Sequence, residues 1–257
     1  MTTNNDPKET LQKVLSELSL KTVLSDLDSF LDWGEREAPG YSRFLERILT
    51  EELRGRKERR LENALRQARL KNAPSLDDYD FSIRPKLSAK AVKELATCRF
   101  VDEGRNILCL GKPSTGKTFI ARALGRCACL RGLSVQAKVT ADLLDELHAA
   151  EIDGSARRIW QRYVRCRLLI LDELGYLPLD ERKANMLFRL VSARYEERRS
   201  IVVTSNTTFR RWGSFFPNEA QAVATVERLI DRATILRFSG KGCRGPQDIF
   251  GAALDDE

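Results

Sequence analysis

The chain has 257 residues, of which 32% are charged and 42% hydrophobic, and its formal net charge is +7. This composition is typical of a soluble globular protein, and the basic balance favours polyanionic partners. It excludes a membrane-spanning protein, because no apolar run approaches the roughly 20 residues that a span requires. The N-terminus has no apolar signal segment and the six cysteines form no C-x-x-C pair, so we expect a reduced, cytoplasmic protein without a zinc site.

The first part of the chain is predicted to be helical. Leucines recur at helical spacing from residue 11 onward, Pro39 and Gly40 interrupt the pattern, and a further helix follows to about residue 69. Residues 53–71 are strongly basic, with only Glu58 and Glu62 opposing eight cations. Such a run either binds a phosphate backbone or forms a solvated helix face. The eight cations are Arg54, Arg56, Lys57, Arg59, Arg60, Arg66, Arg69 and Lys71.

Pro74 is predicted to end this helix, and residues 75–87 are predicted to form an extended linker. We therefore divide the chain into three segments. Residues 1–74 form a small all-helical domain for contact with a partner or DNA, 75–87 form the linker, and 88–257 form a larger domain.

Five apolar runs alternate with helical segments in this larger domain. They cover about 106–110, 134–139, 167–173, 200–206 and 234–238. Near-continuous apolar strands that alternate with helices form a parallel sheet with both faces covered. The predicted fold class is therefore α/β, with a parallel sheet.

The strongest functional signal is the octapeptide from Gly111 to Thr118, which fits the phosphate-loop pattern G-x-x-x-x-G-K-[ST]. A predicted strand precedes it and a predicted helix follows it, so loop N–H groups and the helix N-terminus together form an anion site. In this pattern Lys117 reaches the β- and γ-phosphates, and the Thr118 hydroxyl ligates Mg²⁺. We predict a nucleoside triphosphate site at Gly111, Lys112, Pro113, Ser114, Thr115, Gly116, Lys117, Thr118 and Phe119.

Polar residues end two of the other predicted strands. Asp172 and Glu173 follow an apolar run, and ligands of parallel sheets lie beyond the carboxyl ends of the strands. We expect Asp172 to help hold Mg²⁺ and Glu173 to polarise the attacking water. Asn206 ends the fourth run, where it either orients that water or serves only as a turn residue.

The chain resembles the IstB-like helper ATPases of bacterial insertion sequences, a branch of the AAA+ superfamily close to the DnaC helicase loaders. The resemblance covers about residues 75–245. It rests on the phosphate loop, on the run from Leu168 to Leu179 with its Glu-Leu-Gly-Tyr-Leu-Pro segment, on Val203 to Asn206, on Trp212-Gly213 and on Glu227 to Arg232. In the loop, Lys112 stands where the family usually has Pro, and Ser114 stands where it usually has Gly.

The resemblance implies further roles. Asn206 matches the sensor position, and Arg228 matches the arginine that such ATPases insert into a neighbour's nucleotide site. Arg244 matches a second arginine that senses bound phosphates, although its neighbour is Cys243 where the family usually has Tyr. Only 13 residues follow Arg244, too few for the helical lid common in AAA+ proteins. We therefore expect an open site that an adjoining subunit completes in a homo-oligomer.

The predicted function is that of a Mg·ATP-dependent AAA+ ATPase that oligomerises on duplex DNA and helps a transposase to engage its target. No base-reading motif is present, so we expect phosphate contacts with little sequence preference. A second basic cluster joins the one above as a candidate for these contacts. Two alternatives remain: a DnaC-like loader of the replicative helicase, and an adaptor that binds ATP with little turnover. The second cluster consists of Lys138, Arg157, Arg158, Arg162 and Arg165.

Overall fold

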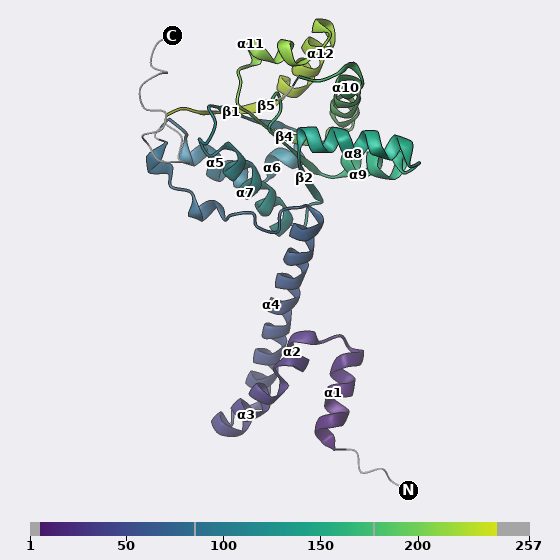
Figure 1. Ribbon diagram of the computed structural model, residues 1–257. Coiled ribbons are helices and arrows are strands. Elements are labelled where there is room, and N and C mark those ends of the chain that lie inside the picture. Colours follow the sequence, from purple (N-terminus) through teal and green to yellow (C-terminus); the bar gives the residue numbers. More distant parts are fainter. Residues whose placement is uncertain (1–5, 85, 177, 241–257) are drawn as a thin grey trace, which may run out of the picture. The chain divides into compact units, whose positions relative to one another are not determined.

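A computed structural model describes residues 6–84, 86–176 and 178–240 and separates the chain into two compact units (Figure 1). The first unit is Met1–Asn63 and the second is Ala64–Glu257. Helix α4 (Tyr41–Gln67) begins in the first unit and ends in the second. Within the described part of the chain, no helix has both the length and the apolar character that crossing a membrane would require.

The first unit is helical, as predicted. It contains α1 (Pro7–Glu17), α2 (Lys21–Ser25), α3 (Leu27–Glu37) and the start of α4. The Asp6 side chain accepts a hydrogen bond from the Lys8 N–H and caps α1, and Pro7 occupies the first turn, where it needs no N–H partner. The Pro39-Gly40 pair separates α3 from α4. The small core of the unit consists of Leu15, Val23, Leu27 and Phe30.

The second unit is built on a five-stranded sheet in the order β2-β3-β4-β1-β5, in which every neighbouring pair is parallel. The predicted parallel α/β fold is therefore confirmed. Each strand begins and ends within one residue of its predicted bounds. The strands are β1 (Asn106–Gly111), β2 (Val135–Val139), β3 (Leu168–Asp172), β4 (Ser200–Ser205) and β5 (Ala233–Phe238).

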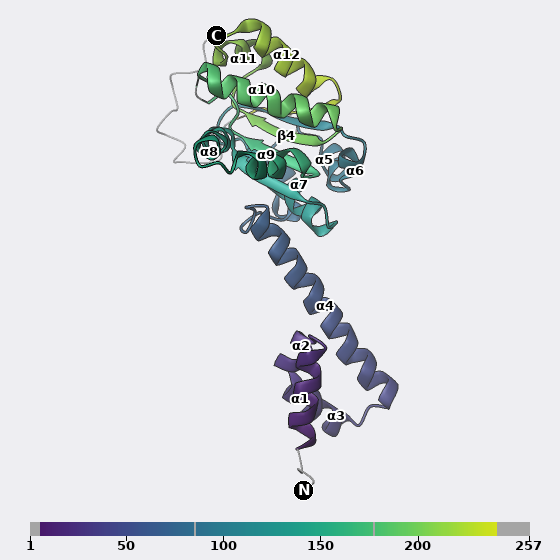
Figure 2. The ribbon, with the colours of Figure 1, turned by 90° about the vertical axis from the view of Figure 1, so that its right-hand side faces the viewer.

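Helices cover both faces of this sheet. Figure 1 shows α5 (Ala89–Ala96) and α7 (Lys117–Leu130) on one side and α8 (Thr140–Ile152), α9 (Ala156–Arg165) and α10 (Glu181–Glu196) on the other. In Figure 2, α10 lies with α12 (Glu219–Ile230) above β4. The larger core joins alternate strand residues, such as Leu169 and Leu171, to apolar side chains of α8, α9, α10 and α12. Short helices α6 (Arg99–Asp102) and α11 (Phe209–Trp212) and the 3₁₀ turn η3 (Gly213–Phe215) complete the unit.

The segment predicted to be an extended linker has a different structure. It contains two 3₁₀ turns, η1 (Leu76–Asp78) and η2 (Phe81–Ile83), each capped at its start by a side chain. Tyr79 and Arg84 are buried. Capping serines and aspartates stabilise such turns, and the buried Tyr79 and Arg84 anchor the segment within the second unit.

One edge of the sheet is covered by the last residue of α4 and the residue that follows it. The Ala137 N–H of β2 donates to the Ala68 carbonyl, and the Gln136 amide donates to the Gln67 carbonyl. The main chain at residues 67–68 thus partners the outer side of β2, an edge strand whose N–H groups would otherwise face water.

Candidate functional site

The phosphate loop connects β1 to α7 and needs glycine at both ends. Gly116 has φ of 94° and forms the N-cap of α7, a left-handed conformation that glycine adopts without steric cost. At Gly111, a Cβ atom would lie 2.1 Å from the Phe238 carbonyl oxygen of β5. Ser114 also lies in the left-handed region, with φ of 58°. This is the loop position at which the resembled family usually has glycine, and a serine costs roughly 1 kcal/mol there.

The Lys117 side chain, which is predicted to bind phosphates, is buried inside the phosphate loop. Only 5% of the residue is exposed, and its Nζ donates to the Lys112 carbonyl at 2.6 Å and lies 3.5 Å from the Thr115 hydroxyl. Burial lowers the pKa of this ammonium group from its usual value. The lysine thus holds an incompletely compensated positive charge at the centre of the loop, a favourable position for phosphate oxygens.

Asp172, at the end of β3, lies beside the loop. Thr118 Oγ1 donates to Asp172 Oδ1 at 2.9 Å, so the predicted metal-binding hydroxyl and carboxylate are adjacent. Thr204 of β4 donates to the same carboxylate oxygen, and Thr140 of α8 donates to the Asp172 main-chain carbonyl at 2.9 Å. Hydroxyl and carboxylate oxygens are the hard ligands that Mg²⁺ prefers, so these residues fit that ion. Sequence reasoning missed Thr140 and Thr204, because a hydroxyl that supports a ligand leaves no spacing pattern.

Glu173 and Asn206 occupy neighbouring strand ends at the same edge of the sheet. Glu173 is exposed and has a left-handed backbone with φ of 58°. The strand register pairs Leu110 of β1 with Ser205 of β4, so Asn206 follows at the level of Gly111. The loop, both acids and Asn206 therefore gather at the carboxyl edge of the sheet, where ligands of parallel sheets bind.

The segment at residues 75–84 also contacts the phosphate loop. Arg84 Nε donates to the Thr115 carbonyl at 3.3 Å. The Tyr79 ring packs against Phe119, with centroids 5.2 Å apart, and a Cβ on Gly116 would lie 2.9 Å from the Tyr79 hydroxyl oxygen. This support was missed because the segment lacks helical or strand periodicity.

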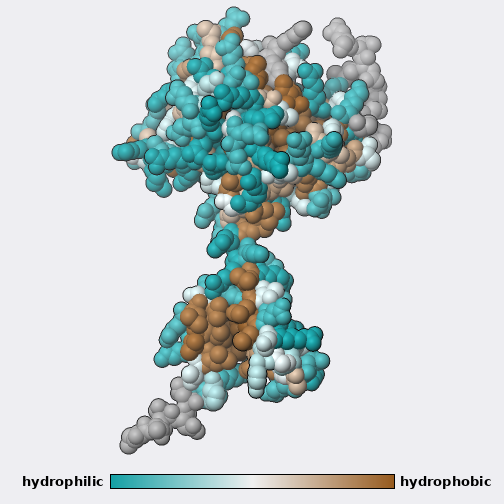
Figure 3. Space-filling view, turned by 180° about the vertical axis from the view of Figure 1, so that it is seen from behind, coloured by the Kyte–Doolittle hydropathy of each residue, from teal (hydrophilic) through white to brown (hydrophobic). Residues whose placement is uncertain are grey.

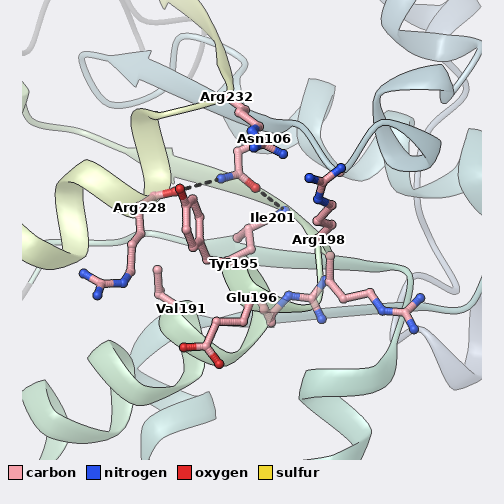
Figure 4. A pocket seen from close by; sticks show the side chains of 11 residues that line it. Asn106, Val191, Tyr195, Glu196, Arg198, Ile201, Arg228 and Arg232 are labelled. Carbon is pink, nitrogen blue, oxygen red and sulfur yellow. Dashed lines mark hydrogen bonds between the residues drawn. The ribbon is translucent and has the colours of Figure 1, made fainter.

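Arg228 lies at the opposite edge of the sheet. It lines a cavity of about 220 Å³ together with Asn106 and Ile201. Asn106 is the first residue of β1, and Ile201 is the second residue of β4. Asn106 Nδ2 donates to the main-chain carbonyls of Arg228 and Leu229, and its Oδ1 accepts the Ile201 N–H, which joins α12 to both strands. Figure 4 shows the bonds to Arg228 and Ile201. A strand rises about 3.3 Å per residue, so β1 separates this cavity from the loop by roughly 16 Å. Arg228 therefore does not reach the phosphate loop of its own chain.

The Arg228 guanidinium is held in place on its own helix. Its Nη1 donates to the Ala224 carbonyl at 2.8 Å, and the group lies 5.1 Å from the centre of the Phe188 ring. The same cavity is basic overall, because its lining contains four more arginines and one glutamate, Glu196. The four arginines are Arg194, Arg198, Arg199 and Arg232. Arg232 is exposed. No role was predicted for this residue from the sequence. Arg244 and the predicted absence of a lid lie outside the described residues.

Both predicted basic clusters are partly neutralised. In the first, Arg54 pairs with Glu51 and Glu58, and Arg56 and Arg59 pair with the buried Glu52. In the second, Lys138 and Arg162 both pair with Glu146. Three exposed arginines of the second cluster, which we call the α9 arginines, make no ion pair among the described residues. They are Arg157, Arg158 and Arg165.

The chain is similar to several known proteins. A family model described as IstB-like ATP binding protein matches residues 13–248. A protein named as an ATP-binding protein of insertion sequence IS21 from Pseudomonas aeruginosa is 36% identical over 91% of this chain and 88% of its own length. A counterpart from insertion sequence IS5376 of Geobacillus stearothermophilus is 30% identical over 92% and 94% of the two chains.

Among solved structures, the DnaC helicase loader aligns with a TM-score of 0.54 and 21% identity over 66% of this chain and 99% of its own. DnaI aligns with a TM-score of 0.56 and 21% identity over 71% and 93% of the two chains. These likenesses show that the chain shares the fold of these proteins. Because the family model matches most of the chain, the chain belongs to the IstB-like ATP-binding proteins.

Proposed function

We propose that this protein is a magnesium-dependent ATPase that assembles on DNA and assists a transposase. The observation that carries the proposal is the 2.9 Å hydrogen bond between Thr118 and Asp172, which joins the phosphate loop to the strand-end carboxylate. The names of the relatives support the context, since they come from insertion sequences, whose movement requires a transposase.

In this proposal each side chain of the site has a distinct role. Lys117 and the loop N–H groups bind the phosphates, and Thr118 and Asp172 hold the metal. Mg²⁺, when bound, supplies positive charge that offsets charge on the β- and γ-phosphate oxygens. Glu173 accepts a proton from the attacking water, and Asn206 orients that water toward the γ-phosphate.

A second copy of the chain completes the site. Because Arg228 lies roughly one strand length from its own phosphate loop, its guanidinium is available only to the nucleotide of a neighbour. The surrounding cavity is strongly basic, and Arg232 lies in it as well, so we assign the charge that stabilises the transition state to Arg228 with Arg232 as its companion. Contacts of this head-to-tail kind build rings or helical filaments.

DNA contact is assigned to the α9 arginines. They are the unpaired members of the second cluster among the described residues, and α9 buries its opposite face through Ile159, Tyr163 and Val164. A helix anchored in this way presents its cations to phosphates without reading bases. Duplex DNA is the expected form.

The first unit is assigned to partner contact. Three leucines spaced four residues apart on α4 are more than half exposed: Leu45 by 56%, Leu49 by 52% and Leu53 by 58%. Figure 3 shows that apolar side chains gather on one face of this unit. Apolar patches of this kind mark protein interaction sites, and the proposed partner is the transposase.

The test is ATP turnover by the purified protein alone, with duplex DNA and with single-stranded DNA. The proposal expects magnesium-dependent phosphate release that duplex DNA stimulates more strongly than single strands. Preferential stimulation by single strands, together with binding to a replicative helicase, would instead identify a helicase loader. Tight ATP binding with no turnover under any of these conditions would identify an adaptor.

A further inference from the structure

Three threonine hydroxyls from three different elements converge on Asp172, and Thr204 differs from the other two. Thr118 contacts only the carboxylate, and Thr140 contacts only the main-chain carbonyl. Thr204 Oγ1 donates to the carboxylate and also accepts the Glu173 N–H at 3.0 Å. One buried hydroxyl on β4 is thus bonded to both acidic residues of the site.

The backbone of Glu173 requires such support. A glutamate with φ of 58° lies in a region that disfavours any residue with a Cβ, and it persists only where surrounding contacts enforce it. Besides the Thr204 hydroxyl, the Thr204 carbonyl accepts the Leu174 N–H at 2.9 Å, and Ser205 Oγ donates to the Leu174 carbonyl at 2.7 Å. Two consecutive residues of β4 therefore hold the turn that directs Glu173.

The hydrogen bonds around Asp172 also leave oxygen atoms available to bind a metal ion. Thr118 and Thr204 each have one hydroxyl proton, and both protons are directed to Asp172 Oδ1. The Thr118 oxygen keeps its lone pairs, and among the described residues Asp172 Oδ2 makes no hydrogen bond. The carboxylate is therefore fixed through one oxygen while the other remains free for a metal or its water.

We propose that Thr204 is a positioning residue that orients both Asp172 toward magnesium and Glu173 toward the attacking water. This inference rests on the proposed function, since it assigns a role within the same ATPase site. Thr204 touches neither the nucleotide nor the metal and acts through the two acids.

Thr204→Val and Thr204→Ser are the informative variants. Thr204 is 1% exposed, and valine has nearly the same shape but no hydroxyl, whereas serine keeps the hydroxyl. Thr225→Val is the matched control, because Thr225 is equally buried and its hydroxyl bonds, within the described part of the chain, only the Gln221 carbonyl of α12. Any general effect of removing a buried hydroxyl appears in this control.

The first measurement is the Mg²⁺ concentration that gives half of the ATP-dependent rise in melting temperature. Loss of a hydrogen bond to a charged group predicts about a tenfold increase for Thr204→Val. ATP affinity measured with EDTA stays within about twofold, because the loop is unchanged. The Mg²⁺ requirement of Thr204→Ser stays within about threefold of the original, and that of Thr225→Val does not change.

The second measurement is hydrogen exchange of the Glu173 amide in the protein without nucleotide or metal. It accelerates at least tenfold in Thr204→Val, because the N–H loses its acceptor, and remains protected in Thr204→Ser. In turnover assays kcat falls at least tenfold for Thr204→Val, while KM for ATP changes little.

The proposal is overturned if Thr204→Val keeps its Mg²⁺ requirement within twofold, or if Thr204→Ser is as defective as Thr204→Val. Failure of the proposed function looks different. If the unsubstituted protein binds Mg·ATP but never hydrolyses it, the ATPase assignment fails and the Mg²⁺ and exchange measurements still decide the role of Thr204. If the unsubstituted protein shows no Mg²⁺ response at all, both proposals are overturned.

Discussion

Replacement of Lys117 by Met separates the stability of the phosphate loop from its function. Methionine retains the length and burial of the side chain but removes its charge. Without nucleotide, the ammonium is bonded, among the residues that the structure describes, to the neutral oxygens of Lys112 and Thr115. Their loss costs about 1.5–3 kcal/mol, and relief of the buried charge offsets a similar amount. We therefore expect the free energy of unfolding without ATP to change by about 1 kcal/mol or less.

With ATP the two proteins diverge. At about a hundredfold excess over Kd, a ligand stabilises the folded state by roughly 2.7 kcal/mol. For a unit of this size that corresponds to a rise in Tm of roughly 5–10 °C. Lys117→Met is expected to lose this rise, because the cation that attracts the phosphates is gone.

Thermal unfolding with and without Mg·ATP is the assay, and Lys112→Met is the comparison variant. Lys112 belongs to the same loop, but its side chain is exposed, so most of the ATP-dependent rise should remain. Burial lowers the pKa of Lys117, so the cost of its charge is present at neutral pH and disappears as pH rises toward 10.5. In ATP-free protein this adds stability at alkaline pH that Lys117→Met lacks. An unchanged ATP response in Lys117→Met would refute the role of the buried ammonium.

Three further predictions concern the attacking water, the neighbouring subunit and the ion pairs of Glu146. Glu173→Gln should bind ATP normally but lower kcat at least a hundredfold and leave assemblies long-lived on electron micrographs; full turnover would contradict its role. Arg228→Ala and Arg232→Ala should each keep ATP affinity but lose DNA-stimulated hydrolysis, and mixing either with Lys117→Met should restore part of it; no restoration would argue against a contribution from the neighbour. Although burial raises the pKa of Glu146, hydrogen bonds from Lys138 and Tyr163 hold it below its usual 4.5 overall. Its stabilisation is present above that pH and lost as pH falls through the lowered value, so Glu146→Gln should flatten the acid limb of a stability profile.

Much of the fold could be predicted because its signals are local. The strand positions, the parallel sheet and the break at Pro39-Gly40 follow from apolar runs and from turn residues. The phosphate loop stands out because its chemistry requires a fixed spacing between Gly111 and Thr118. Family resemblance, and not spacing, supplied the interpretation of Arg228, and it favoured the sensor role over the turn role for Asn206.

The rest depends on contacts between segments that are distant in sequence. The Arg84 side chain reaches Thr115 across 31 residues, and Thr204 reaches Asp172 across 32. Neither contact alters the periodicity of its own segment, so a pattern along the chain does not reveal it. For the same reason the partial neutralisation of the basic clusters by Glu52 and Glu146 appears only in three dimensions.

The residues that partner β2 also determine where the chain can be shortened. A fragment that begins near residue 64 retains the Ala68 carbonyl and the Gln67 carbonyl, and with them the cover on the outer side of β2. A fragment that begins after Pro74 would expose that strand to other molecules, and bare strand edges are templates for aggregation. The shorter fragment should therefore precipitate on purification even though it contains the complete phosphate loop.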